Sequence, residues 1–87
     1  MIINIESLYN KKDNRLEPKL IGWLQENIGQ FYATDIYSHD MTTRRIGAGW
    51  EIVYRSEEVP LEGRIITYFE LDIADEEKAL MFVLRWL

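Results

Sequence analysis

Apolar residues recur with helical spacing in two segments of the chain and alternate with polar residues in others. The first helical segment is LEPKLIGWLQENIG, residues 16–29. Pro18 suits the first turn of a helix, and Gly29 suits the position just past its end. The apolar side chains that share one side of this segment are Leu20, Ile21, Trp23, Leu24 and Ile28. We therefore predict an amphipathic helix.

Strand patterns account for most of the remaining apolar residues. Residues 1–5 are rich in β-branched side chains, and residues 30–37 are rich in aromatic ones. Apolar residues occupy alternate positions in residues 46–55 and again in residues 64–73, which predicts two half-buried strands. The faces predicted to be buried carry Ile46, Ala48, Trp50, Ile52 and Tyr54 in the first of these strands and Ile65, Thr67, Phe69 and Leu71 in the second.

Turn residues separate the strands. The stretch SEEVPLEG, with Pro60 and Gly63, connects the last two strands, which should pair as an antiparallel hairpin. The polar stretch NKKDNR, residues 10–15, also has the composition of a turn. Gly47 and Gly49 in IGAG lack the spacing and the lysine of a phosphate-binding loop, and they indicate a bend or bulge within a strand.

These elements follow one another in the order β-α-β-β-β-α. We predict a single α+β domain over residues 1–87, in which two helices pack on an antiparallel sheet of three to four strands. A length of 87 residues and a hydrophobic content of 47% suit one globular domain. A chain this short buries only about 60% of its unfolded surface, so a partner subunit would add usefully to its stability.

The second helical segment is EEKALMFVLRWL, residues 76–87. Asp72 is placed to cap it, with Asp75 at the third helical position. Acidic residues in the first turn and Arg85 near the end complement the helix dipole. Helical spacing gathers one arc, which we expect to cover the sheet, from Ile73, Leu80, Val83, Leu84 and Leu87, and a neighbouring arc from Ala79, Phe82 and Trp86.

The apolar side chains of the neighbouring arc must also be buried against another surface. The first helix could lie alongside it through Trp23, or Phe82 and Trp86 could help to form a surface for a second subunit or a target protein, because clustered aromatic residues commonly anchor interfaces. Both arrangements could hold in part. The predicted partner-binding residues are Met81, Phe82, Arg85 and Trp86.

Charge and composition narrow the classes of partner. The net charge of −5 disfavours nucleic acid and anionic membranes as ligands but permits a basic protein. The chain contains no cysteine, which excludes disulfides and thiolate chemistry. It shows no secretory signal pattern and no apolar run near the roughly 20 residues that span a bilayer, so we expect a soluble cytoplasmic protein.

Residues capable of catalysis are few. The adjacent residues Ser38, His39 and Asp40 indicate a polar turn, because neighbours in a loop cannot adopt the geometry of a catalytic triad. One histidine and no cysteine leave no zinc site of the familiar kinds. Arg44 and Arg45 form a basic pair that should serve nearby carboxylates rather than nucleic acid. We predict no catalytic residue, metal or cofactor.

The acidic residues leave two alternatives open. Rows of carboxylates can mimic the phosphates of DNA and capture a DNA-binding protein. The candidates for this surface are Glu57, Glu58, Glu62, Glu70, Asp72, Asp75, Glu76 and Glu77. Carboxylates of the same group could instead hold Ca²⁺ or Mg²⁺ in a metal-dependent enzyme, although capping and solvation explain them without a metal.

Two stretches resemble a known class of protein. The segment ITYFELDIADEEKALMFVLRWL, residues 66–87, resembles the carboxyl ends of small accessory proteins encoded by tailed bacteriophages, and GAGWEIVYRS, residues 47–56, looks like their middle strand. The resemblance implies a small protein that binds a host enzyme or counters a host defence in the bacterial cytoplasm, and it carries over no active-site residue. We therefore predict a non-enzymatic module that binds and modulates or inhibits a host protein, with a homodimer as a further possibility.

Overall fold

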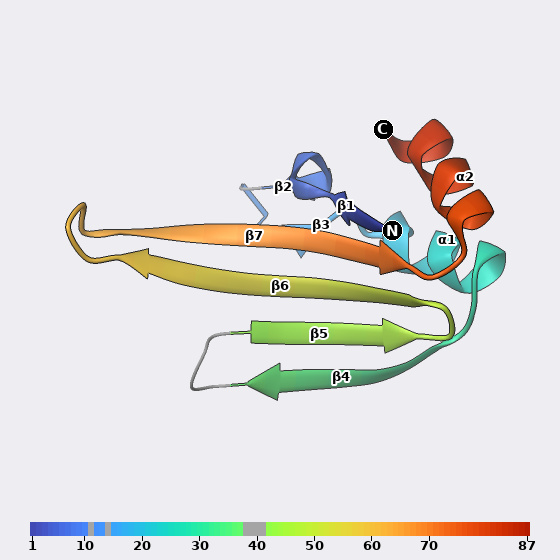
Figure 1. Ribbon diagram of the computed structural model, residues 1–87, viewed down its shortest axis with the longest axis horizontal. Coiled ribbons are helices and arrows are strands. Elements are labelled where there is room, and N and C mark those ends of the chain that lie inside the picture. The colour runs from blue at the N-terminus through green and yellow to red at the C-terminus, as the bar shows by residue number, and fades with distance from the viewer. Residues whose placement is uncertain (11, 14, 38–41) are drawn as a thin grey trace.

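The computed structural model describes residues 1–10, 12–13, 15–37 and 42–87 (Figure 1). Its helices are the 3₁₀ turn η1 (Glu6–Leu8), α1 (Lys19–Asn27) and α2 (Glu76–Trp86). Its strands are β1 (Ile2–Asn4), β2 (Tyr9–Asn10), β3 (Arg15–Leu16), β4 (Phe31–Tyr37), β5 (Thr42–Gly47), β6 (Trp50–Val59) and β7 (Arg64–Ile73).

The strands form a five-stranded sheet in the order β1-β7-β6-β5-β4, in which every neighbouring pair is antiparallel. A separate two-stranded ribbon joins β2 to β3. The α+β class and the β6–β7 hairpin are therefore confirmed, whereas the sheet contains more strands than the three to four that we predicted. The first strand lies at one edge, beside β7, and β4 forms the other edge.

The predicted strand through Ile46 is in fact two strands. β5 ends at Gly47, the chain turns at residues 48–49, and β6 begins at Trp50, which pairs with Gly47. Gly49 has a φ of 80°, a backbone conformation that glycine adopts without strain. Because Gly47 and Trp50 lie opposite each other, they share a face, and Ile46 points to the other side of the sheet. The prediction that Ile46 shares a face with Trp50 was wrong because the alternation runs through this tight turn.

The β2–β3 ribbon was not predicted beyond its turn composition. The side chain of Asn10 holds the turn, since its Oδ1 accepts the Lys12 amide at 2.9 Å and its Nδ2 donates to Asp13 at 3.0 Å. The ring of Tyr9 stacks on Phe69 of β7, with 4.3 Å between ring centroids. This contact fixes the ribbon against the sheet.

Helix α1 has the boundaries that the sequence predicts. Pro18 lies at its N-cap and Gly29 follows its end, where the amides of Ile28 and Gly29 donate to the Leu24 carbonyl at 2.9 and 3.0 Å. Leu20 and Leu24 are fully buried.

The predicted cap of α2 was displaced by one turn. Asp75 is the N-cap, and its Oδ1 accepts the Lys78 amide at 3.0 Å. Asp72 lies within β7, where its carboxylate is 3.4 Å from the amino group of Met1. The acidic first turn of α2 and Arg85 in its last turn agree with the prediction.

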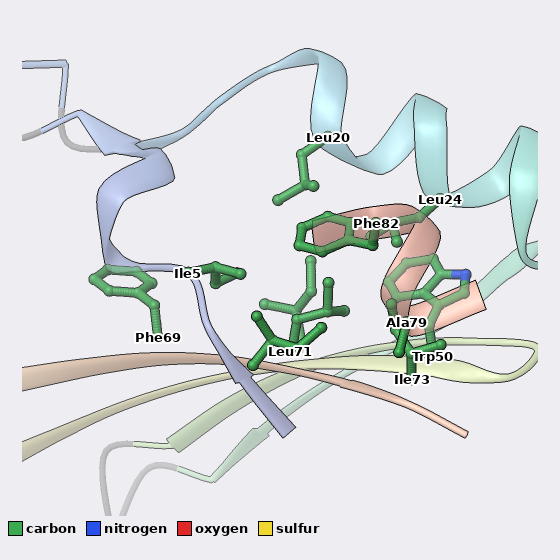
Figure 2. Close-up of a cluster of buried hydrophobic side chains, with 11 residues drawn as sticks. Ile5, Leu20, Leu24, Trp50, Phe69, Leu71, Ile73, Ala79 and Phe82 are labelled. Atoms are coloured by element: carbon green, nitrogen blue, oxygen red, sulfur yellow. The ribbon is translucent and has the colours of Figure 1, made fainter. Parts of the chain in front are cut away.

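The hydrophobic core lies at one end of the sheet. Both helices cover the same face there, and buried side chains of β6 and β7 point up toward them (Figure 2). The β6–β7 hairpin continues well beyond the helices (Figure 1). We call this extension, residues 55–68, the β-arm. Ile65 in the β-arm lies on the helix side of the sheet, as the sequence predicts, yet it is exposed because no helix reaches it.

Candidate functional site

The aromatic side of α2 faces the interior of the protein. Phe82 and Ala79 have no exposed surface. Trp23 of α1 contacts both Phe82 and Trp86 edge-on, with ring centroids 5.7 and 6.4 Å apart. The arrangement in which the first helix covers this arc through Trp23 is therefore the observed one. The prediction that the Phe82 ring forms a partner-binding surface was wrong.

Packing on two sides explains why Phe82 points inward. Its ring lies between the leucines of α1 above and the β-sheet below, where Leu71 and Ile73 project upward (Figure 2). Ile73, expected on the helix, is instead the last residue of β7 and is fully buried in this core.

The other predicted partner-binding residues lie at the rim of this cluster. Trp86 is half-buried, and its Nε1–H has no hydrogen-bond partner among the described residues. The Arg85 guanidinium lies over the Trp86 ring, 5.0 Å from its centroid. Met81 and Arg85 are exposed. Contact of these three residues with a partner stays a prediction.

Three leucines of the arc that we expected to cover the sheet instead face solvent, whereas Val83 of the same arc packs against the core and Ile73 is buried in β7. Leu80, Leu84 and Leu87 are 54%, 88% and 56% exposed. Their spacing of four and three residues places them along one side of α2. We call these three residues the leucine strip. The sequence pattern identified the strip as apolar, but the prediction that these three leucines cover the sheet was wrong.

The acidic residues of the DNA-mimic alternative are spread over several elements. Glu62 pairs with Arg64, Glu70 lies 3.8 Å from Arg55, and Asp72 pairs with the amino group of Met1. Asp75 is used as a helix cap. The carboxylates that make none of these contacts and remain exposed are Glu57, Glu58, Glu76 and Glu77. Because Glu57 and Glu58 are consecutive in a strand, they point to opposite faces.

The two adjacent arginines of β5 have different surroundings. Arg44 pairs with Glu51 at 2.9 Å on the face of the sheet away from the helices, as predicted for a partner of local carboxylates. Arg45 is the cross-strand neighbour of the buried Ile52, so it lies on the helix side. Arg45 forms no ion pair with any residue that the structure describes.

Arg45 borders a cleft of about 480 Å³ on the helix side of the sheet. The β2–β3 ribbon and the start of α1 form one wall, and β5 and β6 form the other. Among the lining residues are Tyr9, Arg15, Ile21, Arg45, Tyr54 and Phe69. We call it the arginine cleft. No pattern in the sequence indicates this cleft, because its two arginines belong to strands that pair with different neighbours.

The structure does not assemble a metal site from the other candidate residues that it describes. Within the part of the chain that the structure describes, no group of three or more His, Asp or Glu side chains is placed to hold a metal ion. Ser38, His39 and Asp40 lie outside the described residues. No described helix is long and apolar enough to cross a lipid bilayer.

Comparison with known proteins does not indicate a family or a function for this chain. No protein-family model, no curated protein and no solved structure matches this chain. The geometry of the leucine strip and of the arginine cleft is therefore the basis for the proposals that follow.

Proposed function

We propose that this chain is a non-enzymatic binding module that works by contact with another protein, and that the leucine strip of α2 is its contact surface. The exposure of Leu84, at 88%, is the observation that carries this proposal. Leu84 is flanked on the same side of the helix by Leu80 and Leu87, so the apolar surface is continuous along α2. Burial of an exposed leucine side chain contributes about 1.5–3 kcal/mol to association.

The partner that fits this surface is an apolar helix bordered by basic side chains. Leucines at i, i+4 and i+7 form the kind of ridge that packs against a second helix. Glu76 and Glu77 lie about one turn before Leu80 and are exposed, so they would attract lysine or arginine at one end of that helix. A second copy of the chain suits the strip less well, because each copy carries a net charge of −5.

The resemblance of residues 66–87 to phage accessory proteins suggests where such a partner would be found. We propose that the chain modulates or inhibits a host protein in the bacterial cytoplasm. In this proposal the surface is the leucine strip with the neighbouring Met81, and the buried Phe82 supports it from within the core.

A designed peptide can stand in for the partner and test the surface. The probe is a fluorescent amphipathic helix of leucine and lysine, with binding followed by anisotropy against the wild-type protein and against Leu84→Glu and Leu61→Glu variants. Leu61 is the matched control because it is fully exposed at the tip of the β-arm. We expect Leu84→Glu to weaken binding on the order of tenfold to a hundredfold and Leu61→Glu to leave it unchanged.

The charge of the substitution makes this test selective. A peptide that bound through charge alone would bind both variants more tightly, because each variant adds a carboxylate that attracts the lysines. Stronger binding to Leu84→Glu would therefore contradict the proposal. Equal affinities of the two variants would contradict it as well. Sedimentation velocity over a range of concentrations provides a second arm, in which we expect a monomer. A dimer that Leu84→Glu dissociates would overturn the choice of a foreign partner and assign the strip to a second copy.

A further inference from the structure

The arginine cleft joins a positive charge to an aromatic surface in an acidic protein. Tyr54 and Phe69 lie side by side in it, with ring centroids 4.8 Å apart, and Tyr9 stacks on Phe69 from the β2–β3 ribbon. Arg15 and Arg45 enter from opposite walls, one from β3 and the other from β5. No residue of α2 lines this cleft, so it is separate from the leucine strip.

The charges in the cleft favour an anion. Neither Arg15 nor Arg45 forms an ion pair with any described residue, whereas Arg44, Arg55 and Arg64 all do. Glu17 also lines the cleft, and its Oε1 accepts the Lys19 amide at 3.4 Å. Two guanidinium groups (+2) and one carboxylate (−1) leave a charge of +1 on these groups in a molecule whose total is −5. A concave site of one sign concentrates ligands of the other.

The chemistry of the walls narrows the ligand further. A guanidinium group presents parallel N–H donors that match the oxygens of a phosphate or carboxylate. Tyrosine and phenylalanine rings offer an apolar surface on which a planar group can pack. The volume of about 480 Å³ lies within the range of small-molecule sites. We infer that the arginine cleft binds a small aromatic oxyanion, with its charged end at Arg15 and Arg45 and its ring against the tyrosines.

Phenyl phosphate is the probe, and chemical-shift changes in two-dimensional NMR spectra of the whole chain are the readout. We expect it to shift the amide signals of Tyr9, Ile21, Arg45 and Tyr54. Inorganic phosphate, which lacks the ring, and benzyl alcohol, which lacks the charge, should each bind more weakly. The Arg15→Gln and Arg45→Gln variants should lose about tenfold in affinity for phenyl phosphate, and Arg45→Lys should lose part of it because the planar fork is gone.

Arg64→Gln is the matched control. Arg64 is exposed in the β-arm beside Glu62, so this change removes the same charge away from the cleft. We expect it to leave the affinity for phenyl phosphate unchanged. Equal losses in Arg45→Gln and Arg64→Gln would show attraction to overall charge and would overturn the inference. Benzyl alcohol binding as tightly as phenyl phosphate, or shifts confined to residues outside the cleft, would overturn it too.

Discussion

At the scale of single residues, one close approach of two chain segments depends on a glycine. Gly29, just after α1, lies against the backbone of Ala48 in the β5–β6 turn, and its carbonyl accepts the Trp50 indole N–H at 2.6 Å. A β-carbon at Gly29 would overlap the Ala48 carbonyl oxygen. The sequence predicted Gly29 as a helix terminator, but its second role was invisible because Ala48 is distant in the chain.

A pair of alanine substitutions separates these roles. Gly29→Ala should lower the free energy of unfolding by about 1–3 kcal/mol, because backbone atoms must move to admit the new methyl group. Gly22→Ala should raise it by about 0.5–1 kcal/mol, since Gly22 lies on the exposed side of α1 with open space around it. Urea denaturation measures both. A Gly29→Ala protein as stable as Gly22→Ala would contradict the packing of α1 on this turn.

At the scale of elements, the sequence predicted features that depend on neighbouring residues, such as helix ends, but not features that depend on contacts between distant segments. The bounds of α1 followed from Pro18 and Gly29, whose effects are confined to the adjacent backbone. The β5–β6 turn was mistaken for a bend or bulge within one strand. Either feature explains a glycine such as Gly49, which has a positive φ, within a run of alternating apolar and polar residues. The arginine cleft could not be predicted at all, since it forms only when β3 and β5 meet across the fold.

The β-arm should be the least stable part of the large sheet. β6 and β7 stay in register from Trp50↔Ile73 to Val59↔Arg64, but the helices cover only the first half of that ladder. In the β-arm the ladder depends on surface contacts such as the Ser56–Thr67 hydroxyl pair at 3.4 Å and Arg55 over the Tyr68 ring at 5.4 Å.

Hydrogen exchange tests this difference in stability. We expect amides of residues 57–66 to exchange at least about tenfold faster than those of residues 69–73, because opening the β-arm exposes little buried apolar surface. NMR-detected exchange of the intact chain resolves the two groups. Uniform protection along the whole β6–β7 ladder would show that a further contact holds the β-arm.

At the scale of the whole molecule, the chain divides into a covered end and an open end. The structure measures 41 × 24 × 24 Å. Both helices lie at one end of it (Figure 1), and the core gathers beneath them (Figure 2). α2 contributes its aromatic side to that core and its leucine strip to the surface. The sequence established that both arcs of α2 are apolar, but which arc meets the sheet depends on where α1 lies, and no local pattern encodes that position.

The orientation of α2 is the claim on which the proposed binding surface depends, and one pair of variants tests it most directly. Urea denaturation of Phe82→Ala and Leu84→Ala should give very different losses in the free energy of unfolding. We expect about 3–5 kcal/mol for Phe82→Ala, which empties a fully buried site, and less than about 0.5 kcal/mol for Leu84→Ala, which is mostly exposed. A larger loss for Leu84→Ala than for Phe82→Ala would show that the leucines face the core and would remove the basis for the leucine strip.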